Sequence, residues 1–264
     1  MYSEQISEAG RRAADVFSVL GVQVHALQIP EAIQQMEEWI SAATRSHYIA
    51  VTGMHGVVEA QHDPSFKQIL NSADLVVPDG MPLVWLARWR GYPLERRVYG
   101  PELMETFCSK TGARYRHFFY GGAAGVPELL AGILEMQLGV RVVGTYSPPF
   151  RPLMPAEAEE VTELINRAAP DVLWVGLSTP KQERWMYERR KMLRVPVMVG
   201  VGAAFDLSSG RVRQAPRWMR EHGLEWLFRL LMEPRRLWKR YLVYGSAFIG
   251  YVSLELLGWK TFDS

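Results

Sequence analysis

Val172-Leu173-Trp174-Val175-Gly176 runs directly into Leu177-Ser178-Thr179-Pro180-Lys181-Gln182-Glu183, and this segment indicates the fold class most clearly. Its first part is almost wholly apolar, as in a strand that is buried on both faces. Its second part combines a capping residue, a proline and good helix formers, which predicts the start of a helix. A buried strand followed by a helix is the repeating unit of a parallel α/β sheet.

The same alternation recurs along the chain. The other runs that predict strands are Tyr48–Val51, Leu75–Val77, His117–Tyr120, Arg141–Gly144 and Val197–Val201. The amphipathic stretches that predict helices are Glu31–Ala42, Pro101–Thr111, Val126–Leu138, Pro155–Ala168 and Lys181–Leu193. We therefore expect an α/β fold with a mostly parallel sheet and helices on both faces. Ligands bind such sheets at the carboxyl ends of the strands, so functional side chains are expected there.

Composition limits the classes of protein to consider. The 264 residues are 48% hydrophobic and 22% charged, which excludes a disordered or fibrous chain. The single cysteine, Cys108, excludes an internal disulfide framework and a cysteine-rich metal site, and it fits a reducing cytoplasm. The N-terminus lacks the layout of a signal peptide, and its polar first fifteen residues are expected to fray.

Positive charge is concentrated toward the C-terminal end. Residues 211–240 contain nine Lys and Arg against three acids, a local charge of +6, whereas the whole chain carries +2. Arg, Trp, Leu and Tyr become dense after Gly210. We therefore expect a core, residues 1–210, and a basic, aromatic, helical appendage, residues 211–264. The partner expected for the appendage is anionic, and no nucleic-acid partner is expected.

Pro78-Asp79-Gly80 follows the apolar run that ends at Val77. A carboxylate at a strand end, beside a flexible glycine, is well placed to act as a general base. Asp-Gly is also one of the commonest turn pairs, so a simple turn is the alternative. Asp79 is therefore a candidate base, and Gly80 a candidate substrate contact.

Two loops carry residues suited to phosphate. The loop Glu95–Gly100 includes Arg97 and precedes a predicted helix. Arginine binds phosphate through paired hydrogen bonds, and a helix start adds free N–H donors. The alternative is a solvated charged turn. Gly121 and Gly122 follow the strand that ends at Tyr120 and would let a diphosphate approach the backbone. Their sequence matches neither Gly-x-Gly-x-x-Gly nor a Walker loop, so this signal alone is weak.

Three further candidate contacts follow predicted strands. Gln182 could donate into the cleft, Asp206 could accept from a base or ribose, and Tyr146 lies just after the strand that begins at Arg141. The alternatives are a well-capped helix start at Gln182 and a capped turn at Asp206. The histidines lack metal-ligand spacing and there is no Asp-x-Asp clamp, so no metal is expected.

Five blocks of sequence stand in a characteristic order. They are Ala73–Gly80, Arg97–Leu103, Gly176–Glu183, Gly200–Asp206 and Ala215–Leu227. Together they resemble the WecG/TagA/CpsF family of bacterial glycosyltransferases, over the range from about Gly21 to Tyr241. The resemblance implies a compact Rossmann-like core that binds a UDP-sugar, such as UDP-N-acetylmannosamine or UDP-glucose. It also implies inverting transfer to a polyprenyl-diphosphate-linked acceptor in cell-surface polysaccharide synthesis, without a metal or other cofactor, by a peripheral protein at the cytoplasmic face of the plasma membrane.

The resemblance also implies roles for individual residues. Asp79 would be the general base, and Thr52 would lie in the same pocket. Arg97 would neutralise charge on the leaving diphosphate, since backbone donors and an arginine must do so where no metal is used. Gln182 would orient the donor, and Asp206 would contact the nucleotide.

Two substrate-site residues depart from the family's pattern. Met54 stands where many relatives have asparagine, so the asparagine contact with the sugar is absent. Glu102 stands where the family has aspartate, which keeps the carboxylate but lengthens its reach.

Aromatic, aliphatic and basic residues are mixed in residues 226–241, as in a helix that lies in a membrane interface. Tyr241–Leu254 has fourteen uncharged residues, whereas a spanning helix needs about 20. A surface-bound segment on an anionic membrane is therefore expected; the alternative is packing on the core or on another subunit of a homo-oligomer. The resemblance implies that Arg229, Arg236 and Arg240 contact the acceptor diphosphate.

Two other classes of function compete with a glycosyltransferase. A dinucleotide-dependent oxidoreductase would use the same kind of sheet, but the Gly-x-Gly-x-x-Gly motif and its acidic partner are missing. A membrane-surface scaffold would not need polar residues clustered at strand ends. The sequence leaves the donor sugar, the acceptor and the oligomeric state open.

Overall fold

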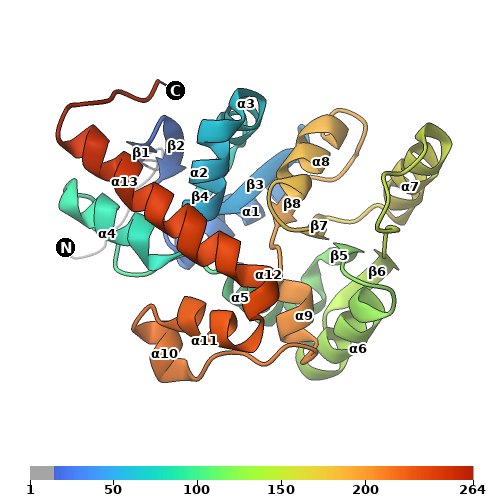
Figure 1. Cartoon of the computed structure of the whole chain (residues 1–264). Helices are drawn as coiled ribbons and strands as arrows, with labels where there is room; N and C mark the ends of the chain where they lie inside the picture. Colours follow the sequence, from blue (N-terminus) through green and yellow to red (C-terminus); the bar gives the residue numbers. More distant parts are fainter. Residues whose placement is uncertain (1–14, 264) are drawn as a thin grey trace, which may run out of the picture.

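The structure is a computed structural model, which describes residues 15–263. Its centre is a six-stranded parallel sheet with the order β4-β3-β8-β7-β5-β6 (Figure 1). The strands are β3 (His47–Thr52), β4 (Leu75–Pro78), β5 (Arg116–Gly121), β6 (Arg141–Tyr146), β7 (Val172–Gly176) and β8 (Val197–Gly200). All six coincide with apolar runs that predict strands, and their ends differ by at most two residues. The predicted parallel α/β architecture is confirmed.

Helices connect the strands and cover both faces of the sheet (Figure 1). In the core they are α1 (Ile29–Ala42), α2 (Met54–His62), α3 (Pro64–Asn71), α4 (Met81–Trp89), α5 (Gly100–Thr111), the 3-10 turn η1 (Gly112–Arg114), α6 (Val126–Leu138), α7 (Pro155–Ala168), α8 (Lys181–Arg189) and α9 (Ala204–Ser208). All five predicted helices are present. Only α8 is clearly shorter than predicted, because the chain turns after Arg189, whose carbonyl accepts from the N–H of Met192 at 2.9 Å.

Alternate side chains of the central strands enter opposite faces of the sheet, as a pleated strand requires. On β3, Ile49 and Val51 join a hydrophobic cluster with α1, α5 and α6, whereas Tyr48 and Ala50 join the clusters on the other face. Because both faces are buried, these strands are continuous apolar runs, which made them recognisable in the sequence.

The structure also contains elements that the sequence analysis does not predict. β1 (Val16–Val19) and β2 (Val22–His25) form an antiparallel hairpin. Its turn residues, Leu20 and Gly21, have φ angles of 53° and 80°, and leucine is rare in that region, so the usual turn signal is missing. Helices α2, α3, α4 and α9 of the core are also not predicted by the sequence analysis. The expected fraying concerns the N-terminus, of which residues 1–14 lie outside the described part of the chain.

The C-terminal segment forms α10 (Arg217–Glu221), α11 (Glu225–Met232), α12 (Pro234–Trp238), the π-helical turn η2 (Lys239–Val243) and α13 (Tyr244–Leu256). α13 crosses the core and packs against α2 (Figure 1). Phe248 of α13 is buried in the same hydrophobic cluster as Val57 and Val58 of α2. Part of the appendage therefore packs on the core, the alternative that the sequence left open. No helix within residues 15–263 is both long and apolar enough to cross a bilayer.

Candidate active site

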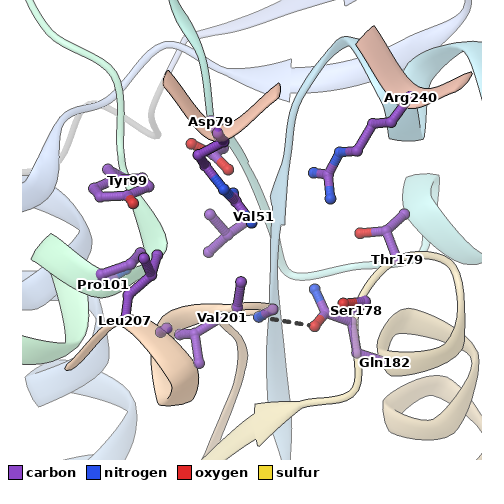
Figure 2. A pocket seen from close by; sticks show the side chains of 14 residues that line it. Val51, Asp79, Tyr99, Pro101, Ser178, Thr179, Gln182, Val201, Leu207 and Arg240 are labelled. Atoms are coloured by element: carbon purple, nitrogen blue, oxygen red, sulfur yellow. Dashed lines mark hydrogen bonds between the residues drawn. The ribbon is translucent and has the colours of Figure 1, made fainter. Parts of the chain in front are cut away.

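A cavity that opens to solvent lies at the carboxyl ends of β3, β4, β7 and β8 (Figure 2). Core segments and the C-terminal segment both line it. Its lining residues are Val51, Asp79, Tyr99, Pro101, Ser178, Thr179, Gln182, Val201, Gly202, Ala203, Ala204, Leu207, Arg229 and Arg240. The cavity therefore lies at the edge of the sheet where the sequence places the functional side chains.

The ends of β3 and β4 hold Asp79 in this cavity. The N–H of Asp79 donates to the carbonyl of Thr52 at 2.7 Å. A side chain at Gly53 would collide with the carbonyl oxygen of Asp79, so the two segments approach closely only because position 53 is glycine. Gly80, with a φ of 125°, then turns the chain into α4.

Asp79 lies in a strongly charged environment. Burial raises the pKa of its carboxyl above the usual range, and Arg97, Arg240 and Arg229 oppose this rise, while Glu225 adds to it. The net pKa is raised, so the carboxylate is a stronger base than an exposed aspartate. A partly buried carboxylate with arginines around it suits proton abstraction beside an anionic ligand.

Arg97 reaches this site from the loop before α5. The N–H of Val98 donates to the carbonyl of Pro78 at 2.8 Å, which ties the loop to the end of β4. The Arg97 guanidinium lies 4.2 Å from the centre of the Tyr99 ring and forms an ion pair with Glu225 of α11. Burial lowers the pKa of Arg97, but the two neighbouring carboxylates more than compensate and raise it.

Gln182 is buried in the first turn of α8, with 1% of its surface exposed. Its side-chain oxygen accepts from the N–H of Gly202 at 3.0 Å, and its Nε2 donates to Glu183 Oε1 at 3.0 Å. The same oxygen of Glu183 accepts from the Thr179 hydroxyl at 2.8 Å. The other carboxylate oxygen, Oε2, is buried with no hydrogen-bond partner among the described residues. Burial raises the pKa of this carboxyl.

Two arginines of the C-terminal segment complete the cavity. Arg240 extends into it from η2, above Thr179 and Gln182 (Figure 2). Arg229 of α11 also lines it, and the buried Nε of Arg229 has no hydrogen-bond partner among the described residues. Arg236, the third predicted acceptor contact, is exposed and pairs with Glu233 at 2.5 Å. The structure thus brings two of the three arginines into the cavity.

A second, larger pocket adjoins the first, and Tyr99 and Pro101 line both. Its lining residues are Met81, Glu95, Arg96, Arg97, Tyr99, Pro101, Glu102, Glu105, Gln214 and Arg220. Glu102 lies here and pairs with Arg96 at 3.4 Å. Carboxylates, guanidinium groups and an aromatic ring together are suited to a polar, hydroxyl-rich ligand.

Comparison with known proteins decides the family. The family model described as Glycosyl transferase WecG/TagA/CpsF family matches residues 17–261. The chain belongs to this family. It is 32% identical over 186 residues to the N-acetylglucosaminyldiphosphoundecaprenol N-acetyl-beta-D-mannosaminyltransferase of Bacillus spizizenii, with 70% of each chain covered. The enzyme of the same name from Bacillus subtilis is 29% identical over 182 residues, which cover 68% of this chain and 69% of the relative.

This WecG/TagA/CpsF glycosyltransferase places Met54 beside its C-terminal segment and Thr52 against α2. The buried hydroxyl of Thr52 has no hydrogen-bond partner among the described residues, and a side chain at Gly56 of α2 would collide with it. The Met54 side chain faces Gly245 of α13, since a Cβ at Gly245 would lie 3.8 Å from Met54 Cε. Met54 therefore contacts the appendage.

Six predicted substrate contacts of the transferase lie outside both cavity linings: Met54, Gly80, Gly121, Gly122, Tyr146 and Asp206. Gly121 and Gly122 are at the end of β5, where the N–H of Gly122 donates to the carbonyl of Gly176 at 3.0 Å. The Tyr146 ring stacks on Tyr120 at 5.8 Å between centroids, on the edge strand β6. Asp206 lies on α9, and its carbonyl accepts from the N–H of Val212 at 2.9 Å.

The structure also adds three residues that sequence reasoning missed: Tyr99, Glu183 and Glu225. Tyr99 and Glu183 fall within the quoted motifs, but a tyrosine in a loop and an acid in a first helical turn are typical of structural positions. Glu225 was counted only as one acid in a basic segment. No group of three or more His, Cys, Asp or Glu side chains that could hold a metal is found within the described residues.

Proposed function

We propose that this glycosyltransferase moves an N-acetylhexosamine-type sugar, with UDP-N-acetylmannosamine the first donor to test, onto a polyprenyl-diphosphate-linked acceptor. The observation that carries this proposal is the position of Asp79: it is partly buried at a strand end and lines a cavity that Arg229 and Arg240 of the C-terminal segment also line. The two Bacillus relatives support the choice of substrates, because their names specify an N-acetylmannosaminyl group and an N-acetylglucosaminyldiphosphoundecaprenol acceptor. UDP-glucose is an alternative donor, because Met54 replaces the asparagine of many relatives.

The proposed reaction is a single inverting displacement. The acceptor hydroxyl oxygen bonds to the anomeric carbon of the donor sugar as the bond between that carbon and the UDP oxygen breaks. Asp79 takes the hydroxyl proton, and the bonding electrons leave with UDP. Arg97 and the two lining arginines stabilise the negative charge that develops on the diphosphate, so neither a metal nor another cofactor is required.

The remaining contacts divide between donor and acceptor. Gln182, in the first turn of α8, is proposed to orient the nucleotide-sugar, because it lines the cavity. Thr52 at the end of β3 and Asp206 on α9 lie outside the cavity lining, and the family resemblance alone supports them as further donor contacts. Arg229, Arg236 and Arg240 are proposed to bind the acceptor diphosphate, because all three come from the segment that would meet the membrane. Of these three arginines, Arg236 is exposed and lies outside the cavity lining.

The C-terminal segment is proposed to lie on the cytoplasmic face of the plasma membrane. Large apolar side chains are exposed on it: Trp226, Leu231, Met232, Trp238, Leu242, Val243 and Ile249. Arg235, Arg236 and Lys239 are exposed among them. Apolar and basic side chains on the same short helices suit insertion at the level of anionic headgroups.

Substrate binding is tested by thermal shift with UDP and NAD. UDP should raise the melting temperature by mass action, and NAD should not. Stabilisation by NAD alone would favour an oxidoreductase, and stabilisation by neither nucleotide would favour a scaffold.

Transfer is tested directly with a panel of UDP-sugars and a synthetic N-acetylglucosaminyl-diphosphate-polyprenol. Product is expected with at least one donor and is expected to be lost in Asp79→Asn. A matched acceptor that carries a monophosphate should be used more slowly, because it loses charge facing the arginines. No product from any donor in the panel would overturn the proposed function.

A further inference from the structure

Glu225, the first residue of α11, joins the C-terminal segment to the core inside the site. It is 4% exposed, although it carries a carboxylate. Its Oε2 accepts from the Arg97 guanidinium and its Oε1 from the Tyr99 hydroxyl. Burying a carboxylate is costly unless its oxygens are paired, and here both oxygens are paired with residues of the core loop before α5.

The start of α11 is fixed by packing as well as by these bonds. Gly223, with a φ of 73°, precedes it, and a Cβ there would lie 2.9 Å from Met81 Cγ of α4. An acid also suits the first turn of a helix, where backbone N–H groups are free. Glu225 therefore reaches the core from a defined position.

Two hydrogen bonds to one carboxylate define the orientation of Arg97. The guanidinium stacks 4.2 Å from the Tyr99 ring centre, and the hydroxyl of that ring binds the same Glu225 side chain. Arg97 is thus held between two carboxylates, Asp79 and Glu225, with only 15% of its side chain exposed. Its orientation depends on whether α11 is in place.

We propose that Glu225 is a positioning residue: it sets Arg97 and Tyr99 over the cavity and makes their arrangement depend on docking of the C-terminal segment. This inference rests on the proposed function, in which Asp79 is the base and Arg97 faces the leaving diphosphate.

Glu225 also affects the base through Arg97. An arginine beside an aspartate stabilises the ionised carboxylate and weakens it as a base. Glu225 partly neutralises that arginine, and its charge raises the pKa of Asp79 directly. Glu225 thereby keeps Asp79 basic while leaving the positive charge of Arg97 close to the diphosphate.

The test compares Glu225→Gln with Tyr99→Phe and a matched control. Glu255→Gln is the control, because Glu255 of α13 also pairs with a core arginine, Arg90, at 2.7 Å, but outside both cavities. Each variant is assayed as the full chain for kcat, for the KM of the UDP-sugar and for the pH dependence of kcat. Hydrogen exchange of residues 225–232 reports whether α11 remains docked.

We expect Glu225→Gln to lower kcat about tenfold or more, with a smaller change in KM, and to move the acid limb of the pH profile to lower pH. Tyr99→Phe should lower kcat without moving the acid limb, because the charge of Glu225 remains. Glu255→Gln should keep the wild-type kcat and pH profile. Both site variants should increase hydrogen exchange in residues 225–232.

Three outcomes would overturn the inference. They are a wild-type kcat and pH profile in Glu225→Gln, an unmoved acid limb despite lower kcat in that variant, and an equal loss of kcat in Glu255→Gln. An inactive wild-type protein with every donor would instead overturn the proposed function, which separates the two failures.

Discussion

The side chain of Gln182 binds the backbone of Gly202: its Oε1 accepts the N–H of that glycine at 3.0 Å (Figure 2). This contact joins the turn after β7 to the turn after β8, and both turns line the same cavity. The amide nitrogen of Gln182 is also hydrogen-bonded, because Nε2 donates to Glu183. Gln182 therefore shapes the cavity wall.

Gln182→Ala should destabilise the fold and weaken donor binding. It leaves the Gly202 N–H and a buried carboxylate oxygen with one partner fewer, which costs about 1–3 kcal/mol for each group left unsatisfied. Urea unfolding would measure the stability, and the KM of the UDP-sugar would report the cavity. Gln34→Ala, on the exposed face of α1, is the control and should leave both unchanged. A stable Gln182→Ala protein with a normal KM would contradict this role.

Asp79→Asn should abolish transfer and yet stabilise the protein at neutral pH. A carboxyl whose pKa is raised on folding contributes stability below its unfolded pKa, and that contribution is lost as the pH rises through the folded pKa. Asparagine does not ionise, so the melting temperature of the variant should exceed that of the wild type near pH 7. The gain should shrink as the pH falls through the raised pKa of Asp79 and be gone below about pH 4.

Asp171→Asn is the control, and its effect on the melting temperature should be opposite to that of Asp79→Asn. Burial alone would raise the pKa of Asp171, but hydrogen bonds from Arg116 lower it below its usual value. Its replacement should lower the melting temperature near pH 7, and the loss should fade as the pH falls. A melting temperature of Asp79→Asn below that of the wild type at neutral pH would contradict the prediction. It would mean that the ionised Asp79 carboxylate stabilises the fold.

The activity of the wild type should fall on acidification. Asp79 must be ionised to accept a proton, and its raised pKa places the acid limb of kcat/KM above the usual aspartate value of about 3.9. A pH series with a saturating acceptor checks this expectation. An acid limb at or below the usual aspartate value would mean that another group is the base.

Gly121→Ala should be strongly destabilising. Gly121 has a φ of 127°, and an added Cβ would lie 2.6 Å from the carbonyl group of Gly176 on the neighbouring strand. The backbone strain alone costs about 1–3 kcal/mol. Gly132→Ala, in an exposed turn of α6 with no atom near the added Cβ, should stabilise by up to about 1 kcal/mol. Equal unfolding midpoints for the two variants would contradict the close approach of β5 and β7.

Leu231→Glu and Leu242→Glu together should weaken binding to anionic vesicles while leaving the fold intact. The two side chains are 71% and 55% exposed, so a glutamate at either position should not disturb the fold in water. Inserting a glutamate carboxylate into an anionic membrane interface is unfavourable, however. Co-sedimentation with vesicles that contain anionic lipid measures the loss. Met136→Glu is the control, because Met136 on α6 is 86% exposed and lies outside the C-terminal segment. Unchanged sedimentation of the double variant would remove these side chains from the membrane contact.

The sheet could be predicted because each strand is recognisable from its own few residues. Strands such as Val172–Gly176 are buried on both faces, so they are apolar throughout and contrast with the amphipathic helices between them. The hairpin could not be predicted, because its turn lacks the usual signal: Leu20 carries a positive φ, where asparagine, aspartate or glycine is expected. Its conformation is imposed by packing, which no short stretch of sequence records.

The candidate site was predictable where a residue follows a strand. Asp79 and Gln182 lie at strand ends and line the cavity. Glu225 could not be found this way, because its role comes from contacts with Arg97 and Tyr99, which are more than 120 positions away in the chain. The same limit applies to the boundary at residue 210, since α13 supplies Phe248 to a core cluster and its removal would uncover that cluster.

The C-terminal segment also packs beside the β1–β2 hairpin. Lys67 donates to the carbonyl of Asp263 at 3.0 Å, and a side chain at Gly21 of the hairpin turn would collide with the same carbonyl. The apolar cluster that holds Phe17 and Val24 also contains Phe248 of α13. The hairpin and α13 therefore share one cluster, and we expect them to open together as one cooperative unit in native-state hydrogen exchange.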